Sequence, residues 1–90
     1  MLRIETESDG DVTTVRVIGR LQSSYVEDLR SALKDVESHV VVLDLSELTL
    51  VDLGVVRFLG ACEDKGIELH HCPRYVREWI SRERAEGKNR

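Results

Sequence analysis

The run VVVLDL at residues 40–45 is almost uninterrupted in its apolar character, and it decides the fold class of this chain. A strand carries such a run when both of its faces are covered, or when it lies in the centre of a parallel sheet. We therefore expect residues 40–45 to form the central strand of a sheet, with the rest of the chain arranged around it.

Upstream of this strand, the sequence predicts a β-hairpin followed by a helix. A weakly alternating segment at residues 2–6 and a β-branched segment at residues 12–18 are separated by the polar turn signal SDGD. Gly19 is expected to end the second strand. Ser24 and Glu27 have the spacing of a capping box that opens a helix. The apolar stripe of this helix consists of Val26, Leu29, Leu33 and Val36.

Downstream of the central strand, two more helices flank a short last strand. The second helix begins at Asp52 and reaches Gly66, a residue suited to the left-handed conformation that ends helices. A short strand follows at residues 67–70, and Pro73 suits the first turn of a third helix. The apolar faces of these helices hold Val55, Val56, Leu59 and Cys62, and then Tyr75, Val76, Trp79 and Ile80. We expect the third helix to close the core.

The order of these segments, β-β-α-β-α-β-α, indicates an α/β fold. Strands that alternate with helices pair in parallel through right-handed crossovers, so only the initial hairpin is antiparallel. The prediction is a four-stranded mixed sheet in a β-α superhelix, with helices mainly on one face. The sequence has no linker, repeat or low-complexity run, so residues 1–90 read as a single domain. Its basic C-terminal tail, about residues 85–90, is expected to fray.

Composition and charge exclude several classes of protein. Of the 90 residues, 41% are hydrophobic and 33% are charged, which is typical of a globular protein and argues against disorder. No apolar stretch is long enough to span a bilayer and no signal peptide opens the chain, so we expect a cytoplasmic protein without membrane insertion. Residues 73–90 hold six Lys/Arg against three Asp/Glu, whereas residues 1–72 hold seven against fourteen. An acidic body disfavours nucleic acid as a partner.

The chain lacks the residue patterns of an enzyme or a metal site. His70 and His71 are neighbours on a predicted strand and point to opposite faces, so they do not converge with Cys62 and Cys72 on a zinc ion. Cys62 lies on the apolar side of a helix, where a buried thiol is inert. No Gly-rich loop could cradle a phosphate. We therefore expect a non-catalytic protein without a metal or a cofactor.

Several short segments, in this order and spacing, resemble the STAS family. They are Gly19-Arg20-Leu21 after a β-branched strand, the run VLDLS at residues 42–46, and Leu50-Val51-Asp52 at a helix start. The resemblance covers roughly residues 2–82. STAS domains occur in anti-sigma factor antagonists and at the cytoplasmic ends of sulfate transporters. The resemblance implies a STAS-like fold and a regulatory role through protein binding.

The resemblance also implies a phosphorylation switch, but its acceptor is missing here. In the family, the acceptor serine lies two positions after the aspartate that opens the helix. Here that aspartate is Asp52, and the acceptor position holds Gly54. Gln22 stands where the family commonly has an aspartate. Moving the alignment by one residue places Leu53 at the acceptor position, so neither register has the serine.

Two other hydroxyls lie in this region. Ser46 and Thr49 are candidate phosphoacceptors, but neither sits at the helix N-terminus, where free backbone N–H groups stabilise a phosphate.

The predicted partner-binding surface combines residues 19–24, residues 46–52 and the start of the second helix. Its residues are Gln22, Ser23, Asp52, Leu53, Gly54 and Val55. Asp52 is a preferred helix N-cap and also a candidate acidic contact for a partner, and both roles can hold together.

Three hypotheses for the function follow. The leading one is an anti-sigma factor antagonist-like regulator without the usual phosphoacceptor, which binds an anti-sigma factor or a related kinase-like protein. The alternative is a STAS accessory subunit of a lipid-trafficking ABC transporter, bound to the transporter ATPase. A nucleotide or lipid binder is permitted by the resemblance, although no residue demands it. The sequence leaves open whether the chain forms a homodimer.

Overall fold

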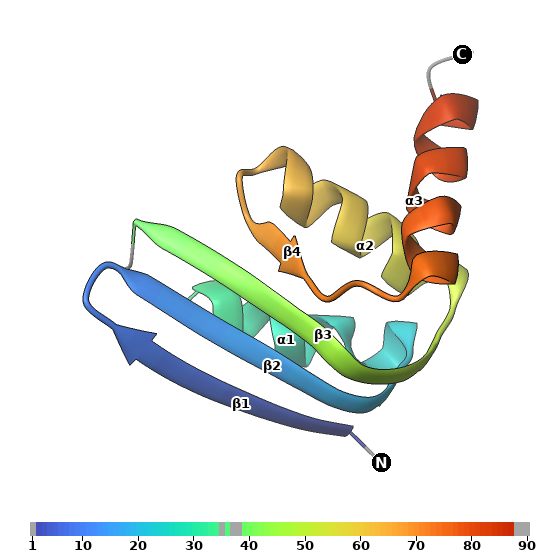
Figure 1. Ribbon diagram of the computed structural model, residues 1–90. Helices are drawn as coiled ribbons and strands as arrows, with labels where there is room; N and C mark the ends of the chain where they lie inside the picture. The colour runs from blue at the N-terminus through green and yellow to red at the C-terminus, as the bar shows by residue number, and fades with distance from the viewer. Residues whose placement is uncertain (1, 35, 37–38, 88–90) are drawn as a thin grey trace.

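The apolar run at residues 40–45 forms the first half of a strand in the interior of the sheet, as the sequence predicts. The computed structural model describes residues 2–34, 36 and 39–87 (Figure 1). The strands are β1 (Leu2–Asp9), β2 (Val12–Leu21), β3 (Val40–Val51) and β4 (Glu68–His70). The helices are the 3-10 turn η1 (Ser23–Tyr25), α1 (Val26–Lys34), α2 (Leu53–Asp64) and α3 (Arg74–Gly87).

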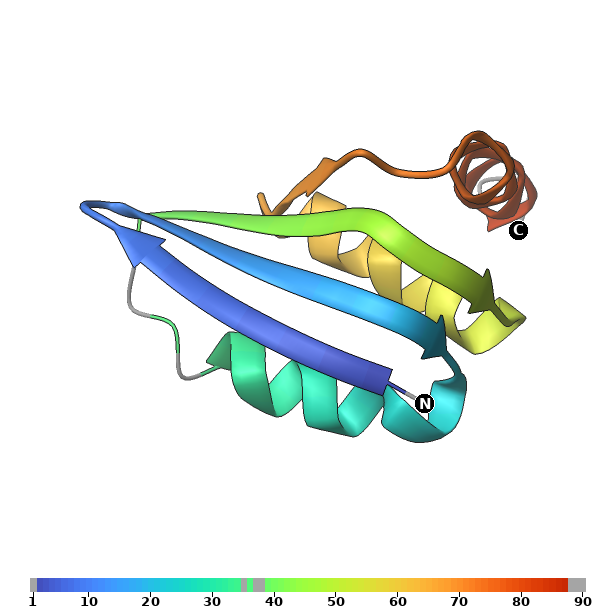
Figure 2. The same cartoon turned by 60° about the horizontal axis from the view of Figure 1, so that its bottom comes forward.

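The sheet has the mixed topology that the sequence predicts. Its strand order is β1-β2-β3-β4, with β1 antiparallel to β2 and the other neighbours parallel. Helices α1 and α2 lie on the same side of the sheet, as Figure 2 shows, and α3 packs beside α2. The α/β prediction, with a four-stranded sheet and the crossover helices on one face, is confirmed.

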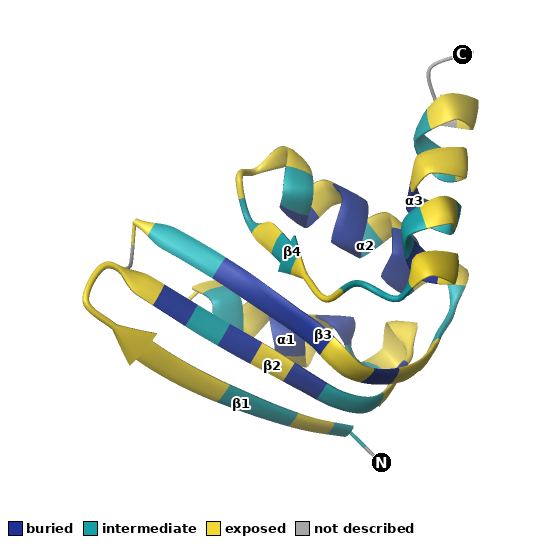
Figure 3. Cartoon of the chain, in the orientation of Figure 1, coloured by how far each residue is buried: buried dark blue, intermediate teal, exposed yellow. Residues whose placement is uncertain are grey.

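The core lies between the sheet and its helices (Figure 3). Alternate residues of β2 are buried, and the parallel register sets Val15 beside Leu43, so both strands supply one apolar layer. The fully or almost fully buried members are Val15, Val17, Leu21, Leu29, Leu43, Leu45, Val55, Val56, Leu59, Val76 and Ile80.

Helix α3 uses a narrower apolar face than the sequence suggests. Val76 and Ile80 are buried in the core, whereas Trp79 is half-buried against it and Tyr75 is 47% exposed. The helix crosses α2 at one stripe, so residues at the margin of the predicted face remain in contact with solvent. The helix continues through Gly87, and residues 88–90 of the predicted frayed tail lie outside the described residues.

The strand ends and the first helix differ from the prediction. Strands β2 and β3 continue to Leu21 and Val51, which pair with each other, so much of the two predicted loops is strand. Gly19 adopts φ 101° within β2, beside a register shift, instead of ending the strand. Ser24 lies inside η1 and forms no capping box, because the chain turns through a 3-10 segment before α1 begins. Val36 lies beyond the end of α1.

Candidate functional site

The connection from β2 to η1 and the connection from β3 to α2 lie side by side at one end of the sheet. The paired ends of β2 and β3 lead directly into η1 and into α2. We call this place the junction, and it consists of Gln22, Ser23, Asp52, Leu53 and Gly54. The structure thus brings together five of the six residues that the sequence predicts for a partner-binding surface.

Asp52 holds the junction together. Its Oδ1 accepts a hydrogen bond from the backbone N–H of Val55 at 3.0 Å, which caps α2. Its Oδ2 accepts from both the backbone N–H and the hydroxyl of Ser23, each at 2.9 Å. One carboxylate therefore caps α2 and also ties η1 to it. The predicted capping role is confirmed, whereas the tie to Ser23 could not be read from the sequence.

The same hydrogen bonds lower the pKa of Asp52. The backbone N–H groups of Ser23 and Val55 stabilise the ionised carboxylate and bring its pKa below the ordinary value of 3.8. A lowered pKa in the folded state means that Asp52 stabilises the fold fully above its unfolded pKa. This stabilisation is lost as the pH falls through the folded pKa.

We expect Asp52→Asn to lower the free energy of unfolding by about 1 kcal/mol at about pH 7. The amide can still accept from Val55, but its nitrogen cannot accept the two bonds from Ser23. The difference from the parent should shrink in acid, at a pH below the lowered pKa of folded Asp52, where the parent carboxylate becomes protonated. Urea unfolding at both pH values measures it. A difference that is equal at both pH values would contradict the role of the charge.

Gly54 is required by the close approach of η1. A Cβ at position 54 would lie 2.8 Å from the Cβ of Ser23, which is closer than side-chain carbons pack. Glycine at this position therefore has a packing reason. Position 54 has no room for a serine unless Ser23 and η1 move.

Apolar side chains surround the connection from β3 to α2. Leu50 is 52% exposed and Leu53 is 39% exposed. Tyr75 at the start of α3 is also exposed, and its hydroxyl donates to the carbonyl of Thr49 at 3.2 Å. We call Leu50, Leu53 and Tyr75 the apolar rim. Sequence reasoning missed Leu50 and assigned Tyr75 to the core, because periodicity does not show which margin of a helix is covered.

Two of the predicted residues have other environments. Val55 is fully buried in the core, so its side chain cannot contact a partner, and its inclusion in the surface was wrong. Gln22 is exposed at the start of η1 and makes no side-chain capping bond there.

The candidate hydroxyls Ser46 and Thr49 both lie on β3, before the N-cap Asp52 of α2. The backbone N–H of Ser46 donates to Oδ1 of Asp44 at 3.0 Å, and Arg16 lies 3.4 Å from the same carboxylate. Burial alone would raise the pKa of Asp44, but Ser46 and Arg16 outweigh it and lower that pKa. This environment is that of a structural carboxylate.

The thiol of Cys62 is buried and that of Cys72 is half-buried. Burial raises the pKa of the Cys62 thiol to about 11, and it also raises that of half-buried Cys72. Both cysteines are free. Across residues 2–34, 36 and 39–87, no group of three His, Cys, Asp or Glu side chains could hold a metal ion.

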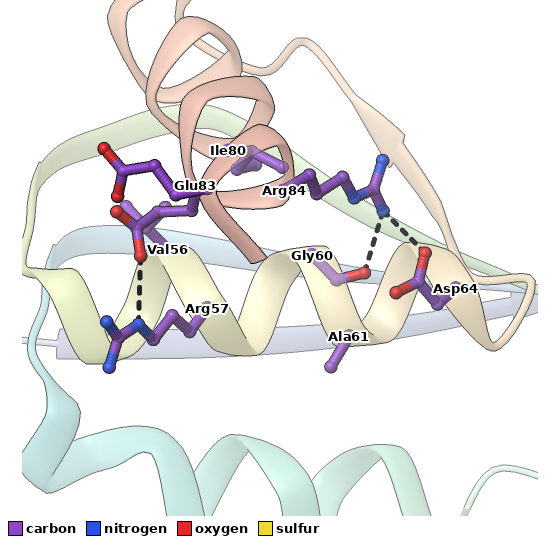
Figure 4. Close-up of a pocket in the computed structure, with 9 residues that line it drawn as sticks. Val56, Arg57, Gly60, Ala61, Asp64, Ile80, Glu83 and Arg84 are labelled. Carbon is purple, nitrogen blue, oxygen red and sulfur yellow. Dashed lines mark hydrogen bonds and ion pairs between the residues drawn. The ribbon is translucent and has the colours of Figure 1, made fainter. Parts of the chain in front are cut away.

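A pocket of about 350 Å³ lies between α2 and α3 (Figure 4). Four of its charged residues form ion pairs: Arg57 pairs with Glu83 at 3.0 Å, and Arg84 pairs with Asp64 at 2.9 Å. Arg84 also donates to the carbonyl of Gly60 at 2.9 Å. No junction residue lines this pocket. These pairs fasten α3 to α2 and do not form a set of free groups for a ligand.

The fold is that of a small α/β domain with a mixed four-stranded sheet. The sequence model of a family described as "Mlab, STAS domain" matches residues 4–86. The chain therefore belongs to the STAS domain family. No helix in the described part of the chain is long and apolar enough to cross a membrane.

Solved structures support the fold assignment. An antisigma-factor antagonist STAS domain from Rhodobacter sphaeroides is 22% identical, with a TM-score of 0.62, over 78% of this chain and 86% of that one. A structure titled "Crystal Structure Analysis of Mglu" is 21% identical, with a TM-score of 0.64, over 78% of this chain. This chain spans only 19% of that protein. No curated protein sequence matches.

Proposed function

We propose that this STAS domain is a non-catalytic regulator that binds a protein partner through the junction and its apolar rim. The observation that carries the proposal is the exposure of Leu50, Leu53 and Tyr75 beside a rigidly capped helix start. Large apolar side chains at one place on a small protein mark an interaction surface. The bonds of Asp52 hold this surface in one conformation, which lowers the cost of binding.

The binding is constitutive in this proposal. A phosphate at position 54 would need a side chain, and Gly54 has neither a hydroxyl nor space for a Cβ beside Ser23. The leading candidate partner is an anti-sigma factor or a related kinase-like protein, as the resemblance to anti-sigma factor antagonists suggests. Such a complex would not be released by phosphorylation at the usual position.

The absence of this switch also favours the alternative partner, a lipid-trafficking ABC transporter ATPase. A permanent accessory subunit needs a stable docking surface and no phosphorylation site. The junction is held together by the bonds of Asp52, and Gly54 offers no hydroxyl. The two candidates differ in the protein that binds, so purified proteins of both kinds are the appropriate probes.

We expect Leu53→Asp to weaken binding to the true partner at least tenfold, which is about 1.4 kcal/mol. A carboxylate in the middle of an apolar contact is desolvated without a counter-ion. The fold should remain, because Leu53 is exposed and an acidic residue in the first turn of α2 suits the helix dipole. Calorimetric titration against the kinase-like anti-sigma factor and against the transporter ATPase gives the affinities.

Val12→Asp is the matched control for Leu53→Asp. Val12 is 38% exposed, almost equal to Leu53, and it lies at the opposite end of the sheet beside the hairpin turn. Val12→Asp should leave the affinity for the partner unchanged. Equal losses in the two variants, or no loss with Leu53→Asp, would refute docking at the junction. The protein that shows the selective loss distinguishes the two candidate functions.

A further inference from the structure

The outer edge of β1 carries backbone groups that no strand pairs. β1 has eight residues and pairs with β2 on one side, and no segment of the described chain lies along its other side (Figure 2). Proteins usually shorten, bulge or cover such an edge, because its free N–H and C=O groups accept another strand. β1 is neither short nor bulged, since it keeps one register along its whole length.

The hairpin turn determines which residues offer these groups. The two-residue turn at Gly10, which has φ 63°, closes on Asp9 and Val12. In a hairpin of this kind the closing residues form a hydrogen-bonded pair, and such pairs alternate along the ladder. The odd-numbered residues of β1 therefore bond to β2. Leu2, Ile4 and Thr6 direct their N–H and C=O groups to the free edge.

Opposite charges occupy the intervening positions. Arg3 and Glu5 lie on the same face of the strand, 2.9 Å apart, with side chains 72% and 42% exposed. If two copies of β1 paired antiparallel around Ile4, Arg3 of each copy would lie opposite Glu5 of the other. These would be non-hydrogen-bonded pairs, in which side chains approach most closely and opposite charges attract.

Charge selects this register over its neighbours. A pairing centred on Arg3, Glu5 or Glu7 would set that residue against its own copy. A pairing centred on Thr6 would set Glu5 against Glu7. Like charges directly opposite each other destabilise a sheet. Among centres at residues 3–7, only Ile4 places no like charges opposite each other.

The helix side of β1 supports the same arrangement. Leu2 and Ile4 are half-buried and pack against the core from the edge of the sheet. Pairing around Ile4 would set Ile4 against Ile4 of the second copy, so the apolar layer would continue across the two-fold axis. Burying this apolar surface would stabilise the dimer, in addition to the backbone hydrogen bonds between the two strands.

We propose that two copies of this chain join through β1, antiparallel and centred on Ile4, to form one continuous eight-stranded sheet. The occupant of the free edge is a second copy, because the sequence of Arg3 and Glu5 is complementary to itself in this register. The interface is isologous, as a two-fold axis requires.

Light scattering after size exclusion tests the dimer with charge-reversed variants. The parent should have twice the 10.3 kDa mass of one chain. Arg3→Glu and Glu5→Arg should each be monomeric, because each sets like charges opposite each other. An equimolar mixture of these two variants should return to the dimer mass, since each charged pair between the two copies is then of opposite charge. The double variant Arg3→Glu/Glu5→Arg should also dimerise.

Arg82→Glu on α3 is the matched control, because Arg82 is exposed and forms no ion pair within the described chain. It should remain dimeric. A monomeric parent at all concentrations, a dimeric Arg3→Glu, or a mixture that stays monomeric would each overturn the proposal. Circular dichroism checks the fold of each variant. If one single variant does not fold, the other single variant tests the register, and a monomeric double variant would also overturn the proposal.

Discussion

Ile80→Ala should lower the free energy of unfolding by about 2–5 kcal/mol. Ile80 is 1% exposed, and its Cγ2 would lie 3.6 Å from a Cβ at Gly60, so it fills the space between α3 and α2. Truncation to alanine removes buried methyl groups and leaves a cavity, because the neighbouring helix can relax only in part. Such a loss is a large fraction of the stability of a small domain.

Urea unfolding of Ile80→Ala, followed by the fluorescence of Trp79, measures this loss. Ser81→Ala is the control on the same helix, because Ser81 is exposed and its truncation should change the free energy by less than about 0.5 kcal/mol. An unchanged midpoint for Ile80→Ala would show that α3 does not close the core. Trp79→Ala should cost less than complete burial of the indole would imply, because Trp79 is only half-buried.

Gly54→Ala should destabilise the domain by about 1–3 kcal/mol, although alanine is the better helix former by about 1 kcal/mol. The new Cβ would lie 2.8 Å from that of Ser23, so η1 must move away. That movement would stretch the bonds from Ser23 to Asp52. Gly60→Ala in the same helix is the control, because its Cβ would make only ordinary contacts. It should be neutral or stabilising.

A double-mutant cycle isolates the clash at Gly54. In a Ser23→Gly background the opposing Cβ is absent, so Gly54→Ala should lose most of its cost, with a coupling of about 0.5–3 kcal/mol. Additive free energies in urea unfolding would show that η1 and α2 do not approach as closely as the structure has them. Gly54→Asp adds a charge to the same clash. Its effect on partner binding is therefore interpreted relative to Gly54→Ala.

The sequence predicted the elements well wherever a pattern is local. Apart from Asp44, residues 40–45 are apolar, and they lie in β3, one of the two strands with a neighbour on each side. Asp52 has the residue type and the position of an N-cap, and it caps α2. Gly66 has φ 92°, as a residue that ends a helix requires. Each of these signals depends only on neighbours within a few residues.

The candidate site was only partly predictable. Val55 has the same apolar character as Leu53, but one is fully buried and the other is 39% exposed. Which of them faces a partner depends on how α2 rotates against the sheet. Tyr75 was assigned to the core for the same reason. From the sequence, Gly54 was interpreted only as the loss of a phosphoacceptor hydroxyl. The close packing of Ser23 against Gly54 has no local sequence pattern, so it could not be predicted.

The sequence by itself determined the order of the elements, the antiparallel hairpin, the parallel crossovers and the cap of α2, since chain direction and side-chain periodicity suffice for these. Only the tertiary structure decided the tie between Ser23 and Asp52, which are 29 residues apart. It also decided the requirement for glycine at position 54, the exposure of Leu50 and the open edge of β1. These features arise where separate elements meet or fail to meet, and contacts between distant residues depend on packing that no local pattern encodes.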